Sequence, residues 1–243
     1  GANADEFARK YNIEASIKKN KEHLEDFIDI NPQIGSDEVG FGDFFGPIVV
    51  VGSYVDKKVI ALIREFGIKD SKALNDKRIL EIVPHILKKV TYSTLIVNNE
   101  KLSKLFSLGY NLNKIKSILH NVVLLNVAKK APKTDRFFID QFTPPKRYYT
   151  YIKEEKEKIT NITFKTHGED AFPSVALSSV IARYTFLKEI EKLDKKYNIK
   201  IPLGASTKVD IFALDFTKKF GITELNKIVK TNFSNYKRLL EKF

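Results

Sequence analysis

The stretch QIGSDEVGFGDFFGPIVVVGSYVD, residues 33 to 56, places two adjacent charges just before the most apolar segment of the chain. The run from Pro47 to Val55 is almost wholly apolar and predicts a buried β-strand. Asp37 and Glu38 precede it, with a glycine-containing bend at 40–42 between. Neighbouring side chains of an extended segment point to opposite faces, whereas a bend lets both serve one site. The pattern therefore favours a functional carboxylate pair beside a central strand.

Outward from this stretch, apolar strands alternate with helical patterns, which is typical of the α/β class. Strands are predicted at residues 45–55, 92–99, 136–142 and 161–170, the last running into a loop. Helices are predicted at residues 57–67, 112–131 and 173–197, within 68–90 after a loop, and in pieces towards the C-terminus. A polar, lysine-rich helical segment over 3–28 is expected to end before Pro32. This divides the chain into a short segment, 1–33, and one domain, 34–243.

Composition narrows the class of partner. The chain of 243 residues carries 42 basic and 30 acidic side chains, a formal charge of +12. This excess indicates either a polyanionic partner such as nucleic acid or a well-solvated lysine-rich surface, with equal support from charge alone. Cysteine is absent, which excludes disulfides and thiolate chemistry. No apolar run is long enough for a membrane span and the first residues are polar, so a cytoplasmic protein is expected.

Acidic residues recur at the ends of predicted strands and the starts of helices. Asp140 closes a short apolar strand, while Glu169 and Asp170 stand just ahead of the helix at 173–197. The strand ends of an α/β sheet commonly form ligand sites. Several clustered carboxylates require cations, and hard divalent ions such as Mg²⁺ prefer oxygen ligands. Each acid taken singly is more often a turn or cap residue, and Asp170 is well placed to cap the following helix.

Polar and basic residues supply candidate phosphate and sugar contacts. Ser71 and Lys72 lie in a loop before a helix, a plausible phosphate site or an ordinary cap. Asn111, Asn113 and Lys114 begin another helix, where asparagine can bond sugar hydroxyls, although capping is favoured for Asn111. The four histidines are widely spaced and predict no metal site. No nucleotide-binding loop or nucleophile elbow is found.

Seven motifs occur together in the order seen in a known family. They are IGSDEVGFGDFFGPIVV, GIKDSKAL, YNLNKIKSILHN, FFIDQF, THGEDAFPSVALSSVIARYTFL, IPLGASTKVD and TNFSNYKR. In this set the chain resembles bacterial ribonuclease HIII, within the type 2 ribonuclease H family, from about Ile34 to Lys237. The resemblance implies a ribonuclease H-like fold, with a central mixed sheet flanked by helices and additional C-terminal helices.

The resemblance also implies an activity and a cofactor. The expected reaction is endonucleolytic hydrolysis of the RNA strand of an RNA/DNA hybrid, with two Mg²⁺ or Mn²⁺ ions, leaving 5′-phosphate and 3′-hydroxyl ends. Family positions of the four metal-binding and catalytic acids fall on Asp37, Glu38, Asp140 and Glu169, with Asp170 as the alternative fourth acid. No membrane and no obligate protein partner is implied.

In two regions expected to contact the substrate, the sequence differs from ribonuclease HII. The turn that contacts ribose hydroxyls falls on Gly40, Phe41 and Gly42, where ribonuclease HII typically has arginine in the middle. The junction-reading tyrosine of ribonuclease HII is absent near Gly204. Both departures argue against excision of single ribonucleotides as the main activity. Two alternatives remain. The first is ribonuclease HII-like cleavage at single embedded ribonucleotides, and the second is a non-catalytic RNA/DNA-binding protein.

One departure concerns the N-terminus. Ribonuclease HIII usually carries an N-terminal substrate-binding domain, and only about 33 residues precede the matching region here, too few for such a domain. We expect either a trimmed or a naturally reduced form.

Overall fold

A computed structural model describes residues 27–68 and 74–242 of the chain. Its centre is a five-stranded sheet with the order β3-β2-β1-β4-β5. The first three strands along the chain pair antiparallel, whereas β4 and β5 join β1 in parallel, so the sheet is mixed as predicted. The strands are β1 (Gln33–Val39), β2 (Ile48–Val55), β3 (Tyr92–Val97), β4 (Phe137–Asp140) and β5 (Ile162–Lys165).

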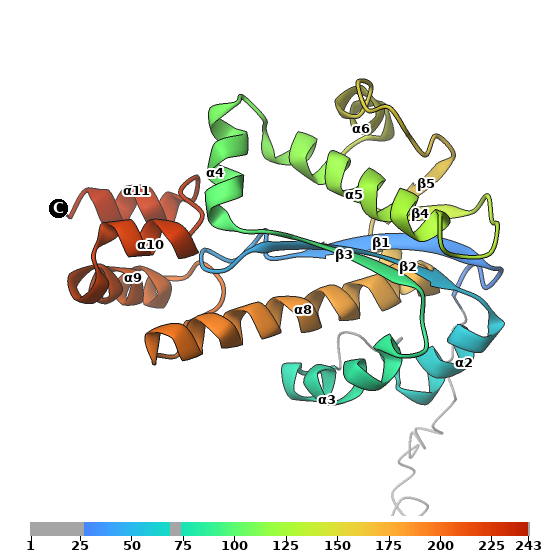
Figure 1. Cartoon of the computed structure of the whole chain (residues 1–243), viewed down its shortest axis with the longest axis horizontal. Helices are drawn as coiled ribbons and strands as arrows, with labels where there is room; N and C mark the ends of the chain where they lie inside the picture. The colour runs from blue at the N-terminus through green and yellow to red at the C-terminus, as the bar shows by residue number, and fades with distance from the viewer. Residues whose placement is uncertain (1–26, 69–73, 243) are drawn as a thin grey trace, which may run out of the picture.

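Helices cover both faces of this sheet (Figure 1). The long α8 crosses one face with α2 and α3 beside it, α5 crosses the other face, and α9 to α11 gather at one end. The bounds are α2 (Lys57–Glu65), α3 (Asp76–Leu87), α4 (Asn99–Ser107), α5 (Leu112–Ala128), α6 (Pro145–Tyr151), α7 (Gly168–Ala171), α8 (Pro173–Tyr197), α9 (Thr207–Phe220), α10 (Ile222–Ile228) and α11 (Ser234–Leu240). No helix within the described ranges is both long and apolar enough to cross a bilayer.

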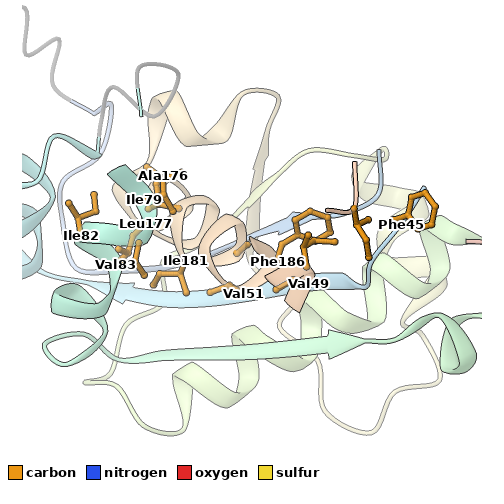
Figure 2. Packing of buried hydrophobic residues seen from close by; sticks show 14 of the residues in the cluster. Phe45, Val49, Val51, Ile79, Ile82, Val83, Ala176, Leu177, Ile181 and Phe186 are labelled. Atoms are coloured by element: carbon orange, nitrogen blue, oxygen red, sulfur yellow. The ribbon is translucent and has the colours of Figure 1, made fainter. Parts of the chain in front are cut away.

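Strand β2 explains why the apolar run decides the fold. All of its residues are buried, because both of its faces are covered by helices. Val49 and Val51 enter the large core between the sheet and α8, together with residues of α3 (Figure 2). Ile48 and Val50 point the other way, into a second cluster that includes residues of α5. The strand begins at Ile48 rather than residue 45, because Gly46 has a left-handed φ of 82° before Pro47.

Strand β1 was not predicted, since the sequence suggested a bend at the carboxylate pair. Its residues lack apolar alternation because small and hydrogen-bonded polar groups meet the covering helices instead. Gln33 accepts a hydrogen bond from the Ser174 hydroxyl on α8 at 2.7 Å, and Ser36 bonds His120 on α5 at 2.8 Å. A strand whose partners are polar shows no hydrophobic period in the sequence.

Other boundaries also differ from the predictions. The strand predicted at 161–170 ends at Lys165 and is followed by α7, while α4 and α6 were not predicted. Asp170 does not cap α8, because that helix begins at Pro173 after Phe172, without a side-chain cap. The helical prediction for residues 3–28 falls mostly outside the described residues, and Phe27 and Ile28 are not helical.

Candidate active site

The adjacent acids of β1 point to opposite faces of the sheet. Asp37 is buried and faces α8, where Ser179 hydrogen-bonds its carboxyl group. Its Oδ1 atom also accepts the backbone N–H of Glu38 at 2.7 Å. Glu38 faces α5 and binds side chains of that helix. The period-two geometry of an extended strand therefore separates the pair.

Asp37 lies among negative charges. Burial, followed by the charges of Glu38 and Asp140, raises the pKa of Asp37 well above its usual range. Asp140 ends β4, which runs parallel to β1, so both carboxylates come to the same edge of the sheet. A bound cation would act in the opposite direction and favour the ionised form of Asp37.

Asp140 also positions the segment that carries the fourth predicted acid. Its Oδ1 atom accepts the backbone N–H of Gly168 at 2.8 Å. A Cβ atom at Gly168 would lie 3.2 Å from the Asp140 Cα, so the close approach favours glycine. Glu169 follows directly on α7, and its Oε2 atom is buried with no hydrogen-bond partner among the described residues. A buried carboxylate oxygen without a donor is well suited to a cation.

The acids are nevertheless not assembled into a closed ligand shell. Within residues 27–68 and 74–242, the one group of three potential ligands with atoms within 4.8 Å of one another is His167, Glu169 and Asp170. The histidine spacing predicted no such group; the left-handed backbone of His167, φ 56°, folds it back towards Glu169. The four predicted acids share oxygen donors suited to hard divalent ions. They fit such ions because a cation would offset the charges of Glu38 and Asp140 that act on Asp37 and would meet the unpartnered Glu169 Oε2 atom.

Glu38 is held by two residues that the sequence reasoning missed. Its Oε1 atom accepts from the Lys116 ammonium at 2.5 Å, and its Oε2 atom lies 2.7 Å from the His120 Nε2 atom. Burial opposes ionisation, but the His120 and Lys116 contacts prevail and lower the pKa of Glu38 to about 2. The available signal was the four-residue spacing of Lys116 and His120, which puts both on one helix face.

The predicted sugar-reading turn is rigid at one end and open at the other. Gly40 has a φ of 98°, and a Cβ there would lie 2.3 Å from the Pro47 carbonyl oxygen. Gly42 is exposed and a Cβ there would meet nothing within 4 Å. The Phe41 ring is half-buried and lies 4.3 Å from the Lys116 ammonium. The turn thus offers free space beside Gly42 and a fixed side chain at Phe41.

A buried lysine fastens this turn to the C-terminal helices. The Lys230 ammonium donates to the carbonyls of Asp43 and Gly46, each at 2.7 Å. The Asp43 carboxylate accepts the Gly204 N–H at 2.7 Å from the other side. Burial lowers the pKa of Lys230 to about 7, with the charge of Asp43 opposing the change.

The remaining predicted contacts have different outcomes. The Asn111 side chain caps α5 by accepting the Lys114 N–H at 2.9 Å, in line with the capping interpretation. The Lys114 ammonium lies 4.0 Å from the Tyr110 ring, and Asn113 is half-buried on the same turn. Ser71 and Lys72 lie outside the described residues.

Comparison with known proteins finds relatives that match most of the chain. The family model for ribonuclease HII matches residues 34–236. Ribonuclease HIII of Bacillus mycoides is 46% identical over 215 residues, covering 86% of this chain and 69% of that protein. Ribonuclease HIII of Bacillus cereus is 45% identical over 210 residues, covering 85% and 68%. The solved structure of Bst-RNase HIII in complex with Mn²⁺ has a TM-score of 0.83 at 36% identity, covering 88% of this chain and 71% of that one.

Proposed function

The chain belongs to the ribonuclease HII family, and from this premise we propose that it hydrolyses the RNA strand of RNA/DNA hybrids with two divalent cations. The observation that supports the proposal is that Asp37 and Asp140 lie on neighbouring parallel strands, while Asp140 binds the Gly168 N–H, next to Glu169. The charges of Glu38 and Asp140 act on the buried Asp37, and Glu169 has a buried oxygen without a hydrogen-bond donor among the described residues. The Mn²⁺ complex of a relative at 36% identity supports a divalent cation.

Asp37, Asp140 and Glu169 would hold the cations, with Glu38 beside Asp37. Each Glu38 oxygen has one hydrogen-bond partner, so its remaining lone pairs could reach a cation while the Lys116 and His120 contacts persist. Bound ions of this kind activate water and stabilise the leaving 3′-oxygen, which gives 5′-phosphate and 3′-hydroxyl ends. Asp140 keeps its segment in place through the Gly168 N–H. No protein side chain is required as a general base.

Selection of the RNA strand would come from the turn at Gly40 to Gly42. Its exposed backbone beside Gly42 leaves room for a sugar to approach, and backbone amides can read ribose 2′-hydroxyls. Asn113 and Lys114, at the start of α5, are proposed as further contacts to the hybrid, and Ser71 and Lys72 as phosphate contacts. Phe41 replaces the arginine typical of ribonuclease HII, which favours long RNA tracts as substrates over single ribonucleotides.

The test of the site is Asp140→Asn. Asparagine retains an Oδ1 acceptor for the Gly168 N–H, so the fold should persist while the anionic ligand is lost. Cleavage of a hybrid should disappear, and hybrid binding in a gel-shift assay should remain. Asp215→Asn, which changes an exposed acid on α9, is the matched control and should cut normally. Wild-type cleavage by Asp140→Asn would show that the proposed site is wrong.

A single gel separates the alternatives. A hybrid with a long RNA tract is compared with a duplex containing one embedded ribonucleotide, each with Mg²⁺, with Mn²⁺ and with EDTA. We expect cleavage of the long tract only, and none with EDTA. Efficient nicking at the single ribonucleotide would indicate ribonuclease HII-like activity. Binding without cleavage under every condition would indicate a non-catalytic binding protein.

A further inference from the structure

A chain of contacts through Lys116 joins three parts of the site. The ammonium binds Glu38 at 2.5 Å and lies 4.3 Å from the Phe41 ring centre and 5.0 Å from the Phe142 ring centre. Phe41 belongs to the glycine turn, and Phe142 follows Asp140 by two residues. Lys116 therefore contacts one member of the carboxylate pair, Glu38, together with the glycine turn and the segment after β4.

The surroundings of Lys116 fix it in place. Its side chain is only 14% exposed, and that of Glu38 only 12%. His120, one turn further along α5, is fully buried, bonds the second Glu38 oxygen and is itself held by Ser36 at 2.8 Å. The Phe142 ring stacks on His120 with centroids 5.2 Å apart. A buried ion pair with both carboxylate oxygens engaged specifies one arrangement more than it stabilises the fold.

We propose that Lys116 is a positioning residue of the cleavage site, which holds Glu38 and the Phe41 turn in one arrangement relative to Asp140. Partners that orient metal-binding carboxylates affect metal affinity and rate even though they touch neither ion nor substrate. The two aromatic faces favour a cation between them and keep the ammonium from turning to solvent. The inference rests on the proposed hybrid cleavage, and it concerns a residue outside the predicted ligand set.

The primary test is Lys116→Met, which keeps the apolar stem between the rings and removes the charge. We expect kcat on the hybrid to fall by about 10- to 100-fold with KM unchanged, and Mn²⁺ affinity, measured by electron paramagnetic resonance without nucleic acid, to weaken by a similar factor. Lys116→Arg should recover most of both losses. Lys129→Met, which removes an exposed ion-paired lysine just after α5, should change neither.

A second pair of variants covers the case in which Lys116→Met does not fold. Glu38→Gln with Lys116→Met leaves no unpaired buried charge, and it should match Glu38→Gln alone in kcat and Mn²⁺ affinity, because Lys116 acts through Glu38. A further loss in the double variant would overturn the inference. So would a lower melting temperature with unchanged kcat and Mn²⁺ affinity, or tighter Mn²⁺ binding by Lys116→Met, which would make Lys116 a competitor of the cation. If the wild-type protein cuts no hybrid, the proposed function fails, while the Mn²⁺ measurement still decides the role of Lys116.

Discussion

Asp37 and Glu38 are adjacent in the chain, yet their surroundings shift their pKa values in opposite directions. Burial and the charges of Glu38 and Asp140 raise the pKa of Asp37, whereas His120 and Lys116 overcome burial and lower the pKa of Glu38 to about 2. Glu38 is therefore ionised near neutral pH. A bound cation would favour the ionised form of Asp37.

This difference predicts how pH and metal act together on stability. A carboxyl group with a raised pKa keeps its proton in the folded state after the unfolded chain has lost it, so the metal-free protein loses stability as pH rises through that window. A divalent cation binds the ionised form. The increase in melting temperature caused by Mn²⁺ should therefore grow as pH rises from about 4, the ordinary carboxyl pKa, and the growth should be absent in Asp37→Asn. An equal increase at every pH in the wild-type protein would contradict this.

Some of the proposed site residues could be predicted from the sequence, and others could not. The resemblance in motif order predicts Asp37, Asp140 and Glu169 as site residues, whereas the strand ends alone do not, because each acid taken singly is more often a turn or cap residue. Lys116 and His120 could not be assigned, since a lysine and a histidine on an amphipathic helix look like solvated or core residues. Only the pairing of β1 with its neighbours, and the packing of α5 over that strand, brings them to Glu38.

At the scale of elements, the contact between β1 and α8 determines where Asp37 lies. Gly35 permits it: a Cβ there would lie 2.3 Å from the Ser174 Oγ atom and 2.8 Å from the Val175 backbone nitrogen. The Ser178 hydroxyl donates to the Gly35 carbonyl at 2.9 Å. Because small and polar residues form this close contact with α8, β1 has no hydrophobic period by which it could be predicted. The apolar β2 was predicted from its sequence.

Gly35→Ala should therefore destabilise the protein by about 3 kcal/mol or more, because backbone atoms of α8, in addition to the Ser174 hydroxyl, block the new methyl group. Chemical denaturation measures the change. Gly42→Ala is the matched control, since a Cβ there meets nothing within 4 Å and its stability should equal that of the wild-type protein. Equal stability of the two variants would show that α8 lies further from β1 than described.

Substitutions of Asn111, the cap residue of α5, distinguish a structural role for this side chain from a role in substrate binding. Its carboxamide oxygen accepts the Lys114 N–H, so Asn111→Ala should lose about 1 kcal/mol of stability. Asn111→Ser keeps a capping oxygen and should retain both wild-type stability and the wild-type KM for the hybrid. A raised KM with normal stability in Asn111→Ser would instead assign the carboxamide to the substrate.

At the scale of the whole molecule, the C-terminal helices support the segment that follows the glycine turn at 40–42. Residues far apart in sequence meet there: Phe45 forms a β-bridge with Val229, and the Phe44 N–H donates to the Gly204 carbonyl at 2.9 Å. Lys230 lies at the centre, 2% exposed, with its ammonium on the turn carbonyls. No local pattern could predict this assembly, because each contact joins segments more than a hundred residues apart.

The buried Lys230 gives the whole domain a pH dependence of its own. Its pKa is about 7 in the folded protein and near 10.4 in the unfolded chain, so between these values the unfolded state binds more protons and stability rises with pH. The neutral amine can still donate two hydrogen bonds to the carbonyls of Asp43 and Gly46. The slope contributed by this one group is at most about 1.4 kcal/mol per pH unit.

Lys230→Met tests this pH dependence. The difference in unfolding free energy between the wild-type protein and the variant at each pH cancels the contributions of the other titrating groups. The variant should be less stable than the wild-type protein, because it leaves the Asp43 and Gly46 carbonyls without their donor. The stability gap should widen from pH 7 to pH 10, because only the wild-type protein gains stability as Lys230 loses its proton. Urea unfolding at several pH values measures the gap. A gap that stays constant would mean that Lys230 remains charged in the fold, and that the C-terminal helices hold the turn with a permanent cation.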